Sequence, residues 1–230
     1  NGVLKPDVSF QGNQLLTLLN TIYFKDEWMD RFERRQTKPD AFYVSAQQTV
    51  QCDYMNRTYA MHPYTRGEGF TRSALSLKNG GRMVFILPDQ GVSVDTLLAS
   101  PQKAASLFLG VDRGTGKVVF QIPKFSFGSK LNLKKTLHAM GVRCAFESDQ
   151  ADFSGMTQDQ AFFSQILQET HIAIDEKGVE AAAFTKLDYA GTAAPNEKEA
   201  YMILNRPFLY GIVSDGVLLF AGVCNQPAES

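Results

Sequence analysis

The sequence has few cysteines, no excess of charge of either sign and no long run of apolar residues. Its 230 residues include three cysteines, Cys52, Cys144 and Cys224, which are odd in number and widely spaced. This pattern fits neither a disulfide scaffold nor a set of zinc ligands. The three histidines likewise form no HExxH or other metal-ligand spacing. The sequence therefore predicts no metal site and no cofactor.

The balance of charge and the length of the apolar segments exclude two classes of partner. The chain has 23 Lys and Arg against 24 Asp and Glu, a formal charge of -1, which gives no general attraction to nucleic acid. The longest apolar stretch, residues 15–24, is interrupted by Thr17, Asn20 and Thr21. It is also far shorter than the roughly 20 residues that cross a bilayer. We expect neither a nucleic-acid partner nor a membrane span.

The apolar pattern predicts a mixed α+β protein dominated by sheet. Residues 15–24 carry apolar side chains on both alternating faces, which is typical of a central strand. Further strands are predicted at residues 82–87, 117–127, 164–174, 201–213 and 217–224. Ser100 and Pro101 predict a capped helix start, and Leu133, Leu137 and Met140 have helical spacing. No internal repeat or domain linker interrupts this pattern.

One segment does not fit a compact sheet protein. About 25 residues separate the strands near residues 174 and 201, and connections of that length are usually functional or disordered. From Val179 the segment alternates like a strand that has no neighbour. Gly178 before it has wide backbone freedom, and small alanines after it would pass easily between strands. The pattern leaves two interpretations open, a strand able to join a sheet and an ordinary flexible loop.

Several motifs resemble those of the serpin family. The run DEKGVEAAA at residues 175–183 resembles the hinge of a serpin reactive-centre loop. Other serpin-like motifs are LLNTIYFK at 18–25 followed by Trp28 and Phe32, ADFSGMT at 151–157, NRPF at 205–208 and LFAG at 219–222. These motifs stand in the family's order and cover nearly all of the chain from residue 15. The chain is therefore identified as similar to a serpin.

The resemblance implies a particular organisation. We expect an α+β, serpin-like fold with a large mixed sheet, smaller sheets and short helices. Family members are considerably longer, and the helices that they carry at the N-terminus are absent from this chain. Residues 1–230 are then the C-terminal portion of a single serpin-like domain. The partners implied are a target serine protease and a missing N-terminal segment or companion chain.

The resemblance also implies a function without a catalytic residue. A serpin is a suicide substrate whose loop is cleaved by a serine protease and then inserts into the large sheet, so the chain is not expected to be an enzyme. Family spacing places the scissile bond at Thr192-Ala193, where small residues suit a protease with a shallow primary pocket. The hinge residues carried over are Glu176, Gly178, Val179, Ala181, Ala182 and Ala183. Such an inhibitor is expected to be extracellular or in the cell envelope.

Other family positions follow from the motifs. Trp28 corresponds to the breach, the point where insertion begins. Asn20 and Gln168 correspond to the shutter, where an Asn commonly bonds a His that is Gln168 in this chain. The two amides could bond each other, or each could bond nearby backbone.

Two residues depart from the inhibitory pattern. Val179 replaces the usual Thr or Ser at the first inserted position, and Phe184 stands where small residues are typical. They keep open the alternative of a non-inhibitory serpin-fold protein that binds a ligand or acts as a chaperone.

Overall fold

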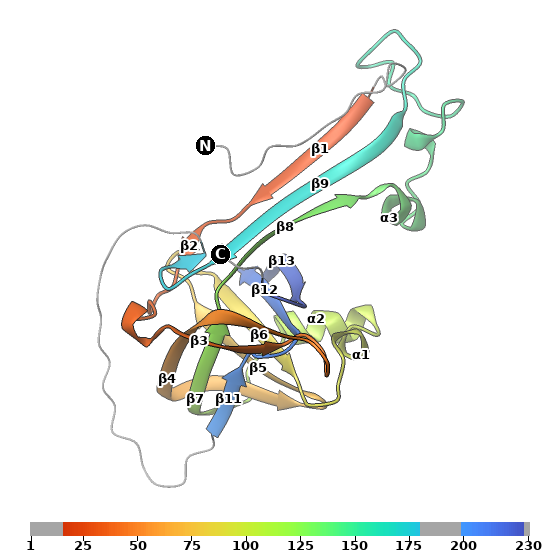
Figure 1. Ribbon diagram of the computed structural model, residues 1–230. Coiled ribbons are helices and arrows are strands. Elements are labelled where there is room, and N and C mark those ends of the chain that lie inside the picture. Colours follow the sequence, from red (N-terminus) through yellow and green to blue (C-terminus); the bar gives the residue numbers. More distant parts are fainter. Residues whose placement is uncertain (1–15, 180–198, 228–230) are drawn as a thin grey trace. The chain divides into compact units, whose positions relative to one another are not determined.

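The computed structural model describes residues 16–179 and 199–227, and Figure 1 shows its elements. The chain divides into two compact units. The first comprises Asn1–Phe24 and Phe127–Ile172, and the second comprises Lys25–Ser126 and Ala173–Ser230. Two long strands, β8 (Phe125–Asn132) and β9 (Phe163–Ile174), begin in one unit and end in the other.

The first unit is built on β9. Strand β1 (Leu16–Tyr23) runs parallel to β9, and β8 also pairs with β9. A short helix, α3 (Lys134–Ala139), and a 3-10 turn, η2 (Cys144–Phe146), follow β8. The strand expected at residues 15–24 is confirmed, but its expected burial is wrong. Leu18 and Tyr23 are each 47% exposed, because β9 is the single strand paired with β1 in the described part of the chain.

The second unit contains an eight-stranded sheet. Its strand order is β11-β7-β4-β5-β6-β12-β13, and β3 pairs with β4. The bounds are β3 Lys38–Tyr43, β4 Thr49–Gly67, β5 Phe70–Ser76, β6 Arg82–Pro88, β7 Gly114–Pro123, β11 Glu199–Ile203, β12 Phe208–Ser214 and β13 Val217–Cys224. Strand β11 runs parallel to β7, and the other pairs are antiparallel. The remaining elements are β2 (Asp26–Glu27), β10 (Gly178–Val179) and the 3-10 turn η1 (Arg34–Gln36).

Two helices, α1 (Val94–Leu97) and α2 (Pro101–Leu109), supply a core for this sheet. The Ser100 side chain accepts a hydrogen bond from the Lys103 amide, so the predicted cap is confirmed. Leu107 and Phe108 of α2 are buried among apolar side chains of β6 and β12. Burying each stabilises the fold by about 1.5–3 kcal/mol.

Two of the predicted strands are interrupted in the structure. Residues 201–213 form β11 and β12 rather than one strand, with a break that contains Pro207, which has no amide hydrogen to donate. At this break, Arg206 turns to donate to the carbonyl of Pro88 at 2.7 Å. Residues 117–127 likewise divide into the ends of β7 and β8, because Pro123 closes β7 and Lys124 separates the two strands.

Candidate functional site: the base of the reactive loop

The first residues after the predicted hinge turn already form a strand. Strand β10 lies between two partners in the second unit. On one side Val179 pairs with Ile174 at the end of β9, and on the other Gly178 and Val179 pair with Glu27 and Asp26 of β2. Val179 is 0% exposed. Strand β10 is therefore already paired on both sides, with the end of β9 and with β2.

A tight turn leads the chain from β9 into β10. The Asp175 carboxylate accepts hydrogen bonds from the amides of Lys177 at 2.8 Å and Gly178 at 3.2 Å. The Asp175 amide donates to the Gly178 carbonyl at 3.0 Å. An aspartate that bonds backbone two or three residues ahead is a common way to fix such a turn.

Gly178 is required at its position by the close approach of β2. A Cβ atom there would lie 2.5 Å from the Glu27 Cα and 2.9 Å from the Trp28 amide nitrogen, and it would also collide with the Asp26 carbonyl. All three contacts are backbone atoms, which cannot move aside as the end of a flexible side chain can. The Gly178 of the sequence motif therefore has a steric reason in this structure.

Trp28, the predicted breach residue, lies against the hinge turn. Its indole Nε1 donates to the Asp175 carbonyl at 2.8 Å, and its amide donates to the Lys177 carbonyl at 3.1 Å. The side chain is fully buried and packs edge to face against the Phe32 ring, with 6.0 Å between the two ring centroids. Trp28 thus fixes the turn through two hydrogen bonds and covers it with a large apolar surface.

Glu176, a predicted hinge residue, has a buried carboxylate of which one oxygen has bonding partners and the other has none. It is 4% exposed, and its Oε1 accepts from Thr37 Oγ1 at 2.9 Å and lies 3.4 Å from Lys124 Nζ. Its Oε2 has no hydrogen-bond partner. Burial by itself would raise the pKa of Glu176, but its own backbone amide, Thr37 and Lys124 outweigh that effect and hold the pKa below its usual value.

The strand opposite the hinge is fixed by its own polar contacts. Asp26 is 5% exposed and accepts hydrogen bonds from the Asn79 side chain at 3.0 Å and the Asn79 amide at 3.3 Å. Glu27 forms ion pairs with Lys78 and with Arg31, the latter at 2.6 Å. The hydrogen bond from Lys78 is the main cause that lowers the pKa of Glu27. Strand β2 is consequently a rigid edge for β10.

The two predicted shutter amides lie in the first unit. The parallel register pairs Asn20 of β1 with Gln168 of β9, so the fold brings them to matching positions. Neither amide side chain forms a hydrogen bond in the part of the chain that the structure describes. The pairing of positions therefore agrees with the motif, but neither predicted bonding pattern is formed.

The remaining predicted site residues lie outside the described residues. They are Ala181, Ala182, Ala183, Phe184, Thr192 and Ala193. Thr37 and Lys124, by contrast, were not found from the sequence. Lys124 had one recognisable signal, a single charge between the apolar ends of two strands.

The described residues contain no group of three or more His, Cys, Asp or Glu side chains arranged to hold a metal ion. Among the helices of residues 16–179 and 199–227, none combines the length and apolar character needed to span a membrane.

The family model for "Serpin (serine protease inhibitor)" matches residues 3–227. The chain therefore belongs to the serpin family, which consists of protease inhibitors and related proteins rather than enzymes, and it has the serpin fold. It is 33% identical to an alpha-1-antitrypsin homolog of Cyprinus carpio over 219 residues, covering 94% of this chain and 57% of that protein. It is 28% identical to Serpin B13 of Homo sapiens, with the same two coverages. The chain thus spans little more than half the length of these curated relatives.

Comparison with solved structures also shows the serpin fold. The crystal structure of Serpin48 from Tenebrio molitor matches with a TM-score of 0.80 and 27% identity, covering 95% of this chain and 58% of that one. Human thyroxine-binding globulin matches with a TM-score of 0.81 and 25% identity, covering 96% of this chain and 59% of that one. The family therefore includes both protease inhibitors and a thyroxine-binding protein.

Proposed function

We propose that this chain belongs to a suicide-substrate inhibitor of serine proteases. In the proposed reaction the protease's serine oxygen attacks the carbonyl carbon of Thr192. The proton of that serine passes to the protease's general base and then to the departing amine of Ala193. An ester now joins the protease to Thr192, and insertion of the loop occurs before water can hydrolyse it.

The observation that carries this proposal is β10. Insertion requires the loop to begin its new strand beside the end of β9, and Val179 already pairs there with Ile174. Since this pair exists before cleavage, insertion starts from an existing strand end, and it proceeds as β1 separates from β9. The entropy of closing a loop opposes the first contact between its ends, before later contacts can compensate for it.

Val179 fits this role although it departs from the family pattern. Its side chain is completely buried in β10, and a β-branched apolar residue is well suited to such a position. A buried hydroxyl in its place would need a hydrogen-bond partner. The replacement of Thr or Ser by Val179 is therefore compatible with insertion.

The test is to mix the full-length protein with a serine protease that has a shallow primary pocket, with pancreatic elastase and subtilisin as probes. We expect an adduct that survives SDS and a released fragment beginning at Ala193. A protease whose catalytic serine is replaced by alanine is the control, and it should give no adduct. Cleavage of the loop with full recovery of protease activity would contradict the proposal.

A second candidate is a serpin-fold protein that binds a ligand and inhibits nothing. The similarity to thyroxine-binding globulin and the bulky Phe184 favour it. The same experiment decides between the two, because this candidate predicts loop turnover without an adduct.

The proposal concerns a domain larger than this chain, because its relatives are longer. We propose that the remaining strands come from a preceding segment or a companion chain, and that the protein acts outside the cell or in the cell envelope. Secretion into the medium, measured by fractionation, tests the location.

A further inference from the structure

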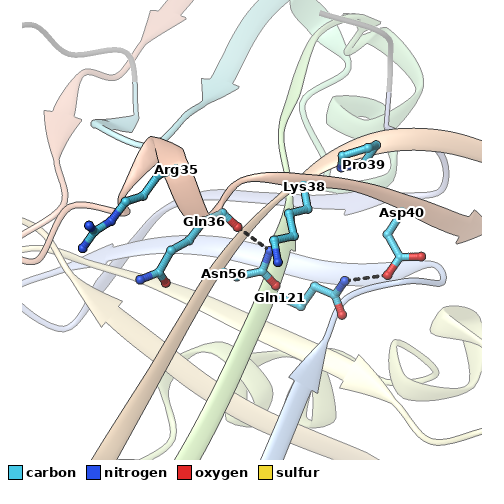
Figure 2. A pocket seen from close by; sticks show the side chains of 7 residues that line it. All are labelled: Arg35, Gln36, Lys38, Pro39, Asp40, Asn56 and Gln121. Carbon is cyan, nitrogen blue, oxygen red and sulfur yellow. Dashed lines mark hydrogen bonds between the residues drawn. The ribbon is translucent and has the colours of Figure 1, made fainter.

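An open, polar pocket of about 590 Å³ lies on the eight-stranded sheet of the second unit. Gln121 Nε2 donates to the Asp40 carboxylate at 2.8 Å, and Asn56 Nδ2 donates to the Gln36 carbonyl at 2.9 Å (Figure 2). Lys38 and Asp40 add opposite charges from the same strand. Because the amides are bonded within the walls and the two charges offset each other, we assign no ligand to this pocket.

The turn between β5 and β6 carries a labile pair of residues, Asn79 followed by Gly80. The amide of an asparagine is thermolabile, because the backbone nitrogen of the next residue can attack its carbonyl carbon. A glycine in that next position has no side chain to hinder the attack. Both residues are exposed, and no atom lies within 4 Å of the place where a Cβ of Gly80 would stand. Among residues 16–179 and 199–227, Asn79 is the one asparagine with this neighbour.

Asn79 also holds β2 against this turn. Its side-chain nitrogen donates to Asp26 Oδ1 at 3.0 Å, and its backbone amide donates to Asp26 Oδ2 at 3.3 Å. The Glu27 amide donates to Oδ1 as well, at 2.7 Å. Asp26 is 5% exposed, and it forms no ion pair with a cation in the described part of the chain. The hydrogen bonds that hold this buried charge therefore come from neutral amides.

We propose that Asn79 is a deamidation site and that its conversion to a carboxylate weakens the attachment of β2 to the turn. The Gly80 nitrogen attacks the carbonyl carbon of the Asn79 side chain and closes a cyclic imide. The side-chain nitrogen of Asn79 leaves as ammonia and takes the proton of the Gly80 amide with it. Water then opens the imide, placing a hydroxyl on one of its two carbonyl carbons and a proton on the ring nitrogen. The product is aspartate or isoaspartate, and the reaction needs no oxidant or reductant.

The hydrogen bonds to Asp26 control when this reaction occurs. They hold both the side chain and the backbone amide of Asn79, so the attack requires them to break. The reaction therefore proceeds through local opening of the turn and is slower than in a free peptide. Once the side-chain nitrogen has left as ammonia, its hydrogen bond to Asp26 cannot form again. A transient opening is thus converted into a permanent change.

The product places a like charge against Asp26. The contact of 3.0 Å that now joins a donor to a carboxylate would join two anionic oxygens at a site with little solvent. The nearby cations Lys78 and Arg31 are both paired with Glu27. The Lys78 amide still donates to the Glu27 carbonyl at 2.9 Å, so β2 is loosened at Asp26 and stays in place at Glu27. Because Asp26 pairs with Val179, the loosened end is the one that supports β10.

The first test follows the modification itself. The full-length protein is kept at mildly alkaline pH, and its peptides are weighed over time. We expect the mass increase of an amide-to-acid conversion at Asn79, together with released ammonia. Asn225, which is also exposed but is followed by a glutamine, is the control and should keep its amide over the same period. If Asn79 keeps its amide as long as Asn225 does, the deamidation site is overturned.

The second test measures the consequence with Asn79→Asp, which supplies one product directly. We expect it to lower the unfolding temperature of the full-length protein by about 5 °C. Asn79→Ala, which removes the donor without adding charge, should lower it about half as much. Asn225→Asp, the same substitution away from Asp26, should change it by less than about 1 °C. Equal unfolding temperatures for Asn79→Asp and Asn225→Asp would overturn the coupling to β2. Neither test uses a protease, so this inference holds or fails apart from the proposed function.

Discussion

The most direct test of the hinge geometry is Gly178→Ala. The added methyl group would lie 2.5 Å from the Glu27 Cα and 2.9 Å from the Trp28 nitrogen. Because these are backbone atoms, β10 must move away from β2 to admit it. Overpacking of this kind costs about 1–3 kcal/mol. For a domain of this size each kcal/mol lowers the unfolding temperature by about 2–4 °C.

The same substitution should separate stability from inhibition. If β10 begins the inserted strand, displacing it delays insertion, and more acyl-enzyme hydrolyses before the protease is trapped. We therefore expect a larger share of cleaved inhibitor and a smaller share of adduct on denaturing gels. Gly155→Ala is the matched control, since no atom lies within 4 Å of the Cβ that it would add. The reasoning is refuted if the Gly178→Ala and Gly155→Ala variants have the same unfolding temperature and give the same ratio of adduct to cleaved inhibitor.

Three further predictions concern buried charges. In the first, the free energy of unfolding in urea is measured for Glu176→Gln, Lys124→Met and the double variant, and we expect a coupling free energy of about 1–3 kcal/mol between the two side chains. If the effects of the two single substitutions simply add, the two side chains act independently. Because the pKa of Glu176 is below its ordinary 4.5, its ionised form stabilises the fold above that pH, and this contribution is lost as the pH falls through the lowered value. In the Glu176→Gln variant, the free energy of unfolding should therefore fall less steeply as the pH drops below about 4.5 than it does in the unmodified protein. The same dependence on pH in both proteins would contradict the lowered pKa. Arg72 closes the end of α2 by donating to the Gly110 carbonyl at 2.6 Å and to the Asp112 carboxylate at 2.7 Å. Arg72→Met should cost about 3–5 kcal/mol in the same urea assay, because the buried carboxylate loses its charged partner and keeps only the Thr65 hydroxyl. A loss below about 1 kcal/mol would mean that solvent replaces the guanidinium.

The hinge prediction rests on a family motif, and the turn that the structure shows at these residues is local. Gly178 and Asp175 act within a four-residue turn, and a short motif can record such a requirement. Thr37 lies 139 positions from Glu176 in the sequence, and no local pattern connects a buried carboxylate to a hydroxyl that distant. The sequence could predict that Glu176 matters in the family, but the fold was needed to supply its partners.

The strands predicted least well are those with irregular burial. In β4 the buried pair Tyr54 and Met55 breaks the alternation, and residues 49–67 therefore gave no strand signal. Strand β4 changes neighbours along its length, pairing with β3 near its start and with β5 near its end. The pairing of β4 with β7 also shifts register between Tyr59 and His62, so a fixed period of two does not persist over the 19 residues of the strand.

Glu176 and Val179 together explain how the hinge can be ordered and still able to extend. Val179 stabilises β10 by burying its side chain completely, whereas the unpaired Oε2 of Glu176 opposes that stabilisation by about 1–3 kcal/mol. The two-residue strand is also held by its backbone pairs and by Trp28 at the turn. Extending β10 along β9 keeps these contacts, but it requires a strand that is now paired with β9 to separate from it, because β9 already pairs with β1 and with β8. Insertion from the hinge therefore leaves the turn at Asp175 in place, and the step that it must overcome is the separation of β1 from β9.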